Sequence, residues 1–391
     1  MEVSPKKILV IRFSSIGDIV LASPVFRCLK QQLPDVEVHF LTKLTMKAVT
    51  EANPYIDQFH YFNNNLNELV PKLMSQQFDL IIDLHKNFRS WFIQFQLKVP
   101  VYAYHKLSRQ KWLLTRFGIN QMPDRHITLR SLDTLTPLGV VNDEQGLDYF
   151  IPEGKGIQLA DIPASHQFGF IAIVIGASYA TKKLPIPKLQ QLCTQIQYPI
   201  ILIGGKEDQE EGNEIASIDP IRIYNACGKF SLHESADLVK HSKLVISHDT
   251  GLQYIACAFN KKVLAIWGGT SPKLAVEPYY GSKQLASHKN EVAYHNFIVP
   301  DLSCQPCSNY GKKNAPKGIL IVCNYKILQA LPLQQCNGSN NYKVFNTSFM
   351  LLTASALLLN AACSSSFNLR SMIFSQPFFP IVTGTPKQIS F

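Results

Sequence analysis

The chain has 391 residues, of which 46% are hydrophobic, and a formal net charge of +10. This size and apolar content suffice for at least one large core and favour two domains over one. The charge favours an anionic partner, namely nucleic acid, an anionic lipid surface or a phosphorylated small molecule, without choosing among them.

The amino terminus predicts no secretory signal, because residues 1–7 lead into the short apolar run Ile8 to Ile11 and then a polar loop. Synthesis is therefore expected to leave this end of the protein in the cytoplasm. The nine cysteines are an odd number, are scattered, and often lie inside apolar runs. Reduced structural thiols are a better prediction than disulfides.

The first half alternates short strands with helices. We predict strands at Lys7–Arg12, Glu37–Leu41 and Phe78–Leu84, and an amphipathic helix at Ile19–Leu33. Strands separated by helices need crossover connections. They therefore predict a parallel α/β sheet covered on both faces, which is the doubly wound pattern.

The same alternation restarts after a turn-rich segment from Val141 to His166. The expected strands are Phe168–Ile175, Pro199–Ile203, Leu244–Ser247 and Val263–Trp267, with an edge strand at Ile221–Tyr224 and helices at Leu189–Gln197, Ser231–His241 and Leu252–Phe259. The sequence thus predicts two Rossmann-like domains, residues 1–160 and 161–320, with a linker near 150–167. A ligand is expected in the cleft between them.

The segment from Leu302 to Phe391 differs in composition, since it holds no Asp or Glu in ninety residues. Within it, the uncharged apolar run Phe349–Ala362 is followed by Cys363 and serines, which resembles a bacterial lipoprotein signal but is internal and short for a membrane span. We treat residues 321–391 as an atypical tail. A disordered or frame-shifted segment, a membrane-contacting segment and a buried helix all stay open for it.

A polar loop, Phe13-Ser14-Ser15-Ile16-Gly17-Asp18, follows the first predicted strand and opens the first helix. Its backbone N–H groups are expected to face the cleft and to attract anionic or oxygen-rich ligands. Simple capping of the helix by Ser15 or Asp18 is the structural alternative. The loop is not GxGxxG, and no acidic residue completes a dinucleotide fingerprint, which disfavours a nicotinamide enzyme.

Two loops of the second half are expected at the carboxyl end of its sheet. His248-Asp249-Thr250-Gly251-Leu252 lies between a strand and a helix, so the amides of Thr250 and Gly251 would point toward a diphosphate that Gly251 allows to approach closely. A helix capped by Asp249 is the plainer alternative. The small-residue loop Gly268-Gly269-Thr270-Ser271-Pro272 follows the next strand. Two loops converging on one crevice favour a ligand site.

Four motifs occur in order along residues 6 to about 320. They are KILVIRFSSIGDIVLASP at the start, GASYATKKLP from Gly176, NACGKFSLHE from Asn225, and SHDTGL followed by IWGGTSP. Together they resemble glycosyltransferase family 9, the lipopolysaccharide heptosyltransferases. The resemblance implies a GT-B fold whose amino-terminal domain holds the acceptor, the inner-core Kdo of lipid A, and whose carboxyl-terminal domain holds ADP-heptose. It implies no metal and no other cofactor.

The resemblance also implies catalytic roles. Asp18 would be the general base that takes the proton of the acceptor hydroxyl, because inversion at an anomeric carbon needs a single carboxylate. Lys182, three residues before Pro185, would stabilise the charge of the leaving diphosphate, with Lys183 beside it.

Donor and acceptor contacts follow on the same basis. Thr250 and Gly251 would bind the donor phosphates, Asp249 would contact the sugar, and Glu207 or Asp208 would accept hydrogen bonds from the ribose. Tyr254 stands where many family members carry His, and it can still donate one hydrogen bond. The residues expected on the acceptor side are Ser14, Ser15, Gly17, Arg89 and Lys106.

The segment from Lys86 to Arg130 mixes cations with aromatic rings. It has nine Lys or Arg against one acid, Asp124, and the interleaved aromatic residues include Trp91, Phe92, Phe95, Tyr102, Tyr104 and Trp112. Such a mixture suits single-stranded nucleic acid, but on the acceptor side it suits phosphorylated lipid A and an anionic bilayer. We predict peripheral association with the cytoplasmic face of the inner membrane and no nucleic-acid partner. A solvated basic face is the alternative.

Other functions are weighed against this one. Cys304 and Cys307 have half the spacing of a zinc site, but Cys323 and Cys336 do not complete it, so no metal is predicted. Rival readings are another GT-B nucleotide-sugar enzyme, with a different donor or as an epimerase, and a catalytically impaired nucleotide-sugar-binding homologue. The second arises because the tail would replace the helix that braces the amino-terminal domain of GT-B proteins.

Overall fold

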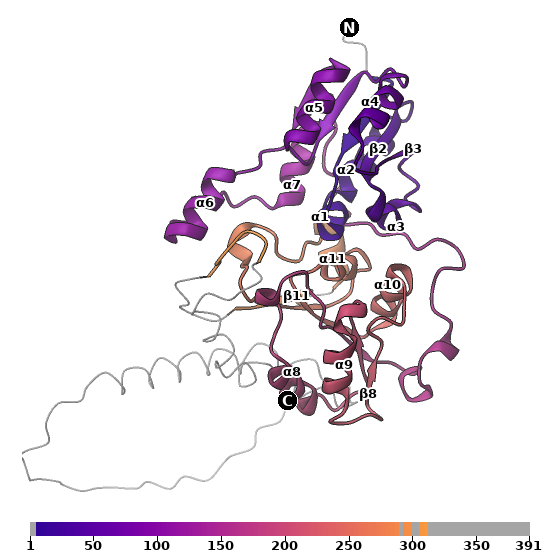
Figure 1. The fold of residues 1–391 in the computed structure, drawn as a ribbon, viewed down its shortest axis with the longest axis vertical. Coiled ribbons are helices and arrows are strands. Elements are labelled where there is room, and N and C mark those ends of the chain that lie inside the picture. Colours follow the sequence, from indigo (N-terminus) through magenta and orange to yellow (C-terminus); the bar gives the residue numbers. More distant parts are fainter. Residues whose placement is uncertain (1–4, 289–291, 299–304, 312–391) are drawn as a thin grey trace, which may run out of the picture. The chain divides into compact units, whose positions relative to one another are not determined.

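The computed structural model describes residues 5–288, 292–298 and 305–311, all of which belong to one compact unit, Met1–Asn337 (Figure 1). The predictions made for residues 321–391 fall outside the described residues and stay predictions. No helix in the described part is long and apolar enough to cross a bilayer.

The first half contains a parallel five-stranded sheet in the order β3-β2-β1-β4-β5. Its central strand β1 is buried at four of five positions and pairs with β2 and β4 on either side. Burial on both faces explains why these strands read as continuous apolar runs. The strands are β1 (Lys7–Ile11), β2 (Glu37–Lys43), β3 (Gln58–Phe62), β4 (Leu80–Asp83) and β5 (Val101–Ala103).

The second half contains a parallel six-stranded sheet in the order β11-β10-β9-β6-β7-β8. The predicted edge strand is confirmed, because β8 ends this sheet. The strands are β6 (Ile171–Val174), β7 (Ile200–Ile203), β8 (Ile223–Asn225), β9 (Leu244–His248), β10 (Val263–Ile266) and β11 (Tyr294–Phe297).

Helices connect the strands of both sheets, as crossover connections require. The first half has α1 (Ile16–Leu21), α2 (Ser23–Gln32), α3 (Lys47–Thr50), α4 (Leu66–Met74), α5 (Phe88–Leu97), α6 (Ser108–Phe117) and α7 (Ile127–Leu132). The second half has α8 (Ile186–Gln195), α9 (Gln209–Ala216), α10 (Leu232–His241), α11 (Gly251–Ala258) and α12 (Ser282–Ser287). Short 3₁₀ turns include η2 (Asp133–Leu138), η5 (Ala180–Lys182), η6 (Lys206–Asp208) and η7 (Pro272–Leu274).

The single helix predicted at Ile19–Leu33 is wrong in one respect, because the chain forms two helices, α1 and α2, that meet at Ala22. Pro24 explains the break. A proline lacks the N–H of a helix interior but is tolerated in the first turn, and Pro24 lies in the first turn of α2.

One hydrophobic cluster runs through both halves. It joins residues of the first sheet, such as Ile8, to residues of the second, such as Val174, through Tyr254 of α11 and Leu147 and Tyr149 of the connecting segment. Two further clusters cover the remaining face of each sheet. Ile162, inside the segment predicted as a linker, belongs to the same cluster, so this segment is partly packed into the core that the two halves share.

Candidate active site

The strand orders place the candidate residues at the points where each sheet reverses its winding. In the first sheet the reversal lies between β1 and β4, and Asp18 follows β1. In the second sheet it lies between β6 and β9, with Lys182 after β6 and Asp249 after β9. Ligands of open parallel sheets bind outside the carboxyl ends of the strands at such points. Three separate stretches of sequence therefore supply candidate side chains at these positions.

Asp18 caps the first turn of α1. Its Oδ2 accepts hydrogen bonds from the backbone N of Ser15 at 3.0 Å and from Ser15 Oγ at 2.8 Å. Its Oδ1 lies 2.7 Å from Nη2 of Arg12, and 27% of the side chain is exposed. The capping alternative and the ligand-facing prediction are thus compatible, since the carboxylate caps the helix and still reaches the surface.

Arg12 fixes this carboxylate from behind. The residue is buried, its Nε donates to the carbonyl of Ser14 at 3.0 Å, and its Nη1 donates to the carbonyl of Leu84. Its guanidinium also lies 5.9 Å from the ring centre of Tyr104. Bonds to the ends of β1 and β4 hold the guanidinium in place, so Asp18 faces a cation that cannot swing away.

The pKa of Asp18 lies below its ordinary value. Burial would raise this pKa, but the positive charge of Arg12 and the hydrogen bonds from Ser15 outweigh burial and lower it. The carboxyl group is therefore ionised at neutral pH. Proton acceptance requires that form.

The amino ends of α1 and α11 pack closely against each other at two glycines. A Cβ on Gly17 would lie 2.8 Å from Cδ2 of Tyr254, and a Cβ on Gly251 would lie 2.6 Å from Cγ2 of Ile16. Glycine at both positions allows the two helices to touch. Glycine at residue 251 is thus required for helix packing, in addition to the close phosphate approach that the sequence predicted. The contact also means that Asp18 and the amino end of α11 lie on two helices that touch.

Asp249 is the centre of a polar cluster in the second half. Its Oδ2 accepts from Lys182 Nζ at 2.7 Å and from Thr270 Oγ1 at 2.9 Å, while its Oδ1 accepts from the hydroxyl of Tyr254 at 3.2 Å. The same hydroxyl also lies 2.7 Å from the carbonyl oxygen of Val276, and its single proton is donated to one of these two acceptors at a time. Asp249 and Tyr254 thus join the two predicted loops of the second half. Thr250, and not Asp249, is the residue before α11, and its side chain makes no capping hydrogen bond.

Buried polar groups position the loop that carries Lys182. The Nε2 atom of His248 accepts from the backbone N of Leu184 at 2.9 Å, which requires the proton of a neutral ring to sit on Nδ1. Burial lowers the pKa of His248 to about 4, so the ring stays neutral. The N of Gly269 donates to the carbonyl of Thr181 at 2.7 Å, and the Gln305 amide contacts the carbonyls of Trp267, Gly268 and Thr270.

Lys183 and the acids near it form a separate cluster. Lys183 Nζ lies 2.6 Å from Asp208 Oδ1 and 2.9 Å from Glu211 Oε2. Asp208 is buried and also accepts from the backbone N of Gly205 at 2.8 Å, whereas Glu207 is exposed. Of the two acids predicted to meet a ribose, only Glu207 is thus free of this ion pair.

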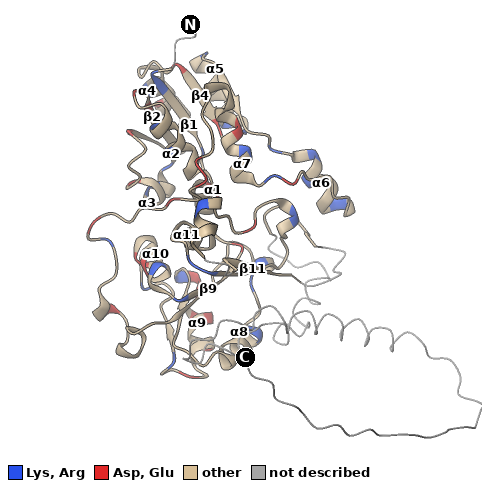
Figure 2. Cartoon of the chain, turned by 180° about the vertical axis from the view of Figure 1, so that it is seen from behind, with Lys and Arg blue, Asp and Glu red and all other residues tan. Residues whose placement is uncertain are grey.

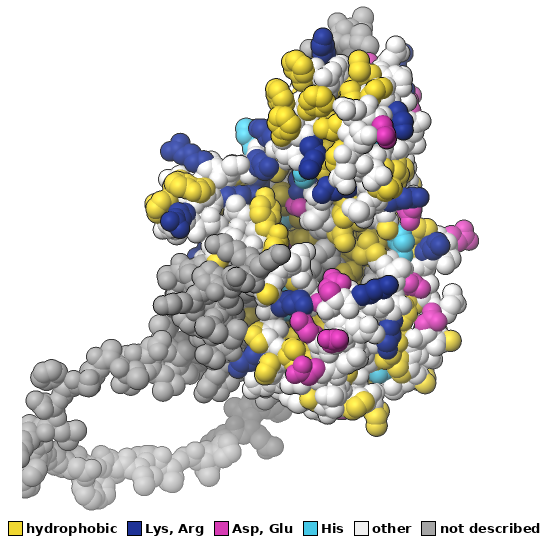
Figure 3. Space-filling model, viewed as in Figure 1, with side chains coloured by type: hydrophobic (Ala, Val, Ile, Leu, Met, Phe, Trp, Pro, Cys, Tyr) yellow, Lys and Arg dark blue, Asp and Glu magenta, His cyan; other side chains and the backbone are white. Residues whose placement is uncertain are grey.

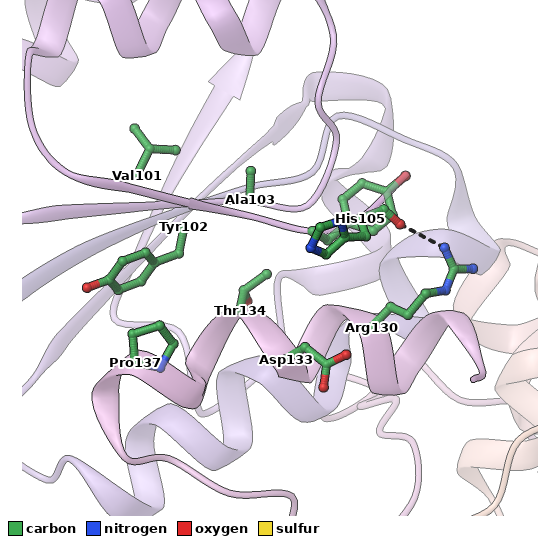
Figure 4. A pocket seen from close by; sticks show the side chains of 9 residues that line it. Val101, Tyr102, Ala103, His105, Arg130, Asp133, Thr134 and Pro137 are labelled. Atoms are coloured by element: carbon green, nitrogen blue, oxygen red, sulfur yellow. Dashed lines mark hydrogen bonds between the residues drawn. The ribbon is translucent and has the colours of Figure 1, made fainter. Parts of the chain in front are cut away.

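Two buried cations that the predicted site did not include lie in the first half. Arg130 is 3% exposed, and its Nη1 donates to the carbonyl of His105 at 2.9 Å (Figure 4). Its Nη2 has no hydrogen-bond partner among the described residues. Lys111 is also buried, and no hydrogen bond to its Nζ is found among the described residues. Burial, together with the charges of Arg130 and Arg12, lowers the pKa of Lys111 to about 8.

Two cavities lie in this part of the first half, and Arg130 lines the first of them. The first, of about 220 Å³, lies between β5 and the segment that carries Arg130, Asp133 and Thr134 (Figure 4). The second, of about 460 Å³, is lined by Lys86, Lys106 and Arg109, and Lys106 Nζ donates to the carbonyl of Lys86 at 3.1 Å. Lys106 thus lies beside a cavity, and the acceptor contact expected for it stays a prediction. Arg89 is exposed on α5, and its guanidinium covers the ring of Phe62 at 5.5 Å.

Residues that sequence reasoning missed share one property, which is burial of a charge. Arg12 lies inside the first motif, yet only its ion pair with Asp18 reveals its role. Lys111 and Arg130 were counted as part of a basic stretch.

The described residues contain no group of three His, Cys, Asp or Glu side chains placed to hold a metal ion. Cys304, Cys323 and Cys336 fall outside this part of the chain. Cys28, Cys193, Cys227 and Cys257 are buried free thiols, as predicted.

Comparison with known proteins agrees with this geometry. A family model described as glycosyltransferase family 9 (heptosyltransferase) matches residues 67–303. Lipooligosaccharide heptosyltransferase 2 of Haemophilus influenzae is 25% identical over 296 residues, which cover 68% of this chain and 84% of that protein.

Solved structures are similar in fold. A glycosyltransferase family 9 protein of Veillonella parvula has a TM-score of 0.61 at 20% identity, over 77% of this chain and 88% of that one. The E. coli ADP-heptose lipopolysaccharide heptosyltransferase II has a TM-score of 0.59 at 16% identity, over 91% of this chain and 99% of that one. With its two parallel sheets the fold is therefore GT-B, as the sequence predicted.

Proposed function

Because this chain belongs to glycosyltransferase family 9, we propose that it transfers heptose from ADP-heptose to the Kdo region of the lipid A inner core, with inversion at the anomeric carbon. It is a glycosyltransferase that acts in lipopolysaccharide core synthesis. The donor, the acceptor and the place of the reaction, the cytoplasmic face of the inner membrane, are the proposed part. The relative whose printed name includes ADP-heptose supports the choice of donor.

The observation that carries the proposal is the state and place of Asp18. The carboxylate is ionised, partly exposed and held by Arg12 and Ser15 on α1, whose amino end touches α11. A base in this position can accept the proton of an acceptor hydroxyl while the hydroxyl oxygen attacks the anomeric carbon. One carboxylate suffices, because the diphosphate is a good leaving group that needs no protonation.

The charge that develops on the leaving diphosphate needs stabilisation from the donor side. The Lys182 ammonium has three N–H donors, and its contacts with Asp249 occupy two of them, the carboxylate at 2.7 Å and the backbone carbonyl at 3.0 Å. The third is available to a phosphate oxygen. The unpaired backbone N–H groups at the amino end of α11, starting from Thr250 and Gly251, would supply the rest without a metal ion.

The acceptor side supports an anionic sugar. Lys111 and Arg130 are buried cations with donors that no described group satisfies, and an unpaired buried cation is costly. A carboxylate such as that of Kdo, or a phosphate, would pair with them. Asp18 and Arg12 both act electrostatically on Lys111, which supports an anion subsite near the proposed base.

Replacing Asp18 by Asn tests the proposal. Donor binding, measured by calorimetry with ADP, should stay nearly unchanged, while ADP release in the presence of deep-rough lipopolysaccharide acceptor should fall by about 10²-fold or more. Asp161→Asn is a matched control, because Asp161 also accepts a backbone hydrogen bond three residues before it, from Gln158 N at 2.7 Å, in an exposed 3₁₀ turn.

Wild-type turnover in Asp18→Asn would remove Asp18 from the role of base. Thermal stabilisation of the wild type by UDP- or GDP-sugars but not by ADP-heptose would contradict the proposed donor. Donor binding without any transfer would favour an impaired binding homologue.

A further inference from the structure

Exposed aromatic side chains gather on two helices of the first half and have no part in the transfer chemistry. We define the aromatic patch as Phe88, Trp91 and Phe95 of α5 with Trp112 and Phe117 of α6. Their exposed fractions are 73%, 55%, 61%, 55% and 58%. Single exposed apolar residues are common, but five large aromatic ones within thirty residues need a partner.

The α5 part of the patch occupies one face of its helix. Phe88, Trp91 and Phe95 are spaced three and four residues apart, and the ring of Trp91 lies 5.7 Å from that of Phe88 and 5.8 Å from that of Phe95. Ser90 and Ile93 on the opposite face are fully buried. The helix therefore packs on the sheet by one face and offers a row of stacked rings on the other.

The α6 part is arranged in the same way. Lys111 and Leu114 are buried, while Trp112 and Phe117 are exposed with ring centres 5.1 Å apart. One side of α6 thus brings Lys111 toward Arg130 and Arg12, and the other side carries exposed rings. The helix connects the proposed acceptor site to the surface.

Cations surround the patch. Arg89 on α5 and Arg109 and Arg116 on α6 are exposed, and residues 86–130 hold nine Lys or Arg against one acid. Lys and Arg lie along α6 and α7 in the ribbon view (Figure 2), and hydrophobic and basic side chains share the surface around α5 and α6 (Figure 3). A second copy of the chain would bring like charges together, which disfavours self-association.

We propose that the outer faces of α5 and α6 dock the protein on an anionic lipid bilayer. The aromatic rings enter the boundary between headgroups and acyl chains, and Arg89, Arg109 and Arg116 contact the anionic headgroups. This inference rests on the proposed function for its purpose, since docking through α6 would bring a lipid-linked acceptor next to Lys111.

The tryptophans allow a direct test with the full-length protein. Of the three in the chain, Trp91 and Trp112 are exposed and Trp267 is 1% exposed, with its Nε1 donating to Asn296 at 2.9 Å. Vesicles containing phosphatidylglycerol should shift the emission to shorter wavelength, and lipids brominated near the headgroup should quench it. Trp91→Phe and Trp112→Phe assign the signal to each helix.

Affinity is measured by co-sedimentation with the same vesicles. Trp91→Ser/Phe95→Ser and Trp112→Ser/Phe117→Ser should each weaken binding by about 10-fold or more, because each removes two rings from the interface. Phe168→Ser is the matched control, since Phe168 is 90% exposed on the second half. Pure phosphatidylcholine vesicles should bind far less than anionic ones.

Three results would overturn the proposal: an emission spectrum unchanged by anionic vesicles, equal binding by the ring variants, or a dimer in sedimentation velocity that the ring variants dissociate. Vesicle binding is measured without donor or acceptor, so it can succeed even if the proposed reaction fails. With a deacylated, water-soluble acceptor the ring variants should keep wild-type ADP release. Loss there would signal damage to the catalytic site, not to docking.

Discussion

Arg12 sets the acidity of Asp18, and this interaction can be tested at the scale of single residues. The Asp18 pKa is lowered, so the reactive carboxylate persists as pH falls. Replacing Arg12 by Met removes the charge and should raise that pKa. The acid limb of the kcat/KM profile should therefore move to higher pH by about 1 to 3 pH units.

Arg12→Lys is the companion variant, because it keeps the charge but cannot bond to Ser14 and Leu84 in the same way. It should keep the acid limb near its wild-type position even if stability falls. An unchanged limb in Arg12→Met, with the protein folded, would show that the activity does not depend on ionisation of Asp18.

Lys111 is a buried cation whose pKa of about 8 makes its charge sensitive to mild alkali. The side chain is a charged ammonium below that pH and a neutral amine above it. The acceptor KM should therefore rise as the pH passes about 8. Lys111→Met should raise the acceptor KM by about 10-fold at pH 7 and abolish the further rise.

The same variant, Lys111→Met, should bind the acceptor less tightly but unfold less readily. Because the folded state disfavours the Lys111 charge, Lys111→Met should stabilise the protein at pH 7 by about 1–3 kcal/mol in urea unfolding. Lys72→Met, at an exposed site on α4, should change neither quantity. A variant that loses stability and keeps its acceptor KM would contradict an anion-binding role.

At the scale of elements, the contact of α1 with α11 depends on two glycines. A Cβ at residue 251 would lie 2.6 Å from Ile16 Cγ2, so Gly251→Ala should force the helices apart, cost about 1–3 kcal/mol and slow turnover. Ile16→Ala removes the closer of the contacting atoms. The double variant Gly251→Ala/Ile16→Ala should therefore be more stable and more active than the sum of the single changes predicts. Strict additivity in unfolding and turnover would show that the helices do not press on each other there.

The elements that the sequence predicted share a strong apolar signal. The runs at β1, β6 and β7 are buried on both faces and are hard to mistake. The edge strand β3 was not predicted, because four of its five residues are only partly buried or exposed, and β5 has only three residues, none fully buried. Edge strands lack the second neighbour that makes a sequence uniformly apolar.

The candidate site likewise contains residues that the sequence indicated and contacts that it could not predict. Asp18, Lys182 and Asp249 stand in motifs next to predicted strands, so strand ends and the resemblance located them. The pairing of Lys182 with Asp249 and of Lys183 with Asp208 could not be predicted, because adjacent lysines give no sign of which one faces the site. Lys182 is the last residue of the turn η5 and Lys183 is the first residue after it, so the backbone conformation at this point directs the two side chains to different partners.

At the scale of the whole molecule, polar contacts fix one half on the other. The N of Ile127 donates to the carbonyl of Ala275 at 3.0 Å, and His126 Nε2 donates to the carbonyl of Glu277 at 3.0 Å. On the connecting segment, Asp143 and Asp148 both pair with Arg27 of α2. Sequence patterns report on neighbours along the chain, so contacts across about 150 residues could not be predicted.

His126 makes this union sensitive to acid. Burial, helped by the charge of Arg130, lowers its pKa to about 3, against the hydrogen bond to Glu277, which raises it. In the neutral ring Nε2 donates to the carbonyl of Glu277 and Nδ1 accepts from the N of Thr128 at 3.2 Å. A second proton would break the latter bond at the start of α7. The ordinary pKa of histidine is about 6.5. Between pH 6.5 and 3, residue 126 is therefore protonated in the unfolded chain but neutral in the folded protein. Stability is therefore full above pH 6.5 and falls below it.

The free energy of unfolding in urea, measured between pH 4 and 7.5, checks this. His126 should contribute a slope of about 1.4 kcal/mol per pH unit below pH 6, and burial also lowers the pKa of His60, His85 and His248 to about 4, which adds to the slope. His126→Asn should be less stable at pH 7.5, where it lacks one bond, yet its stability should fall less steeply with acid. Parallel curves for the two proteins would mean that the junction between the halves is not where acid acts first.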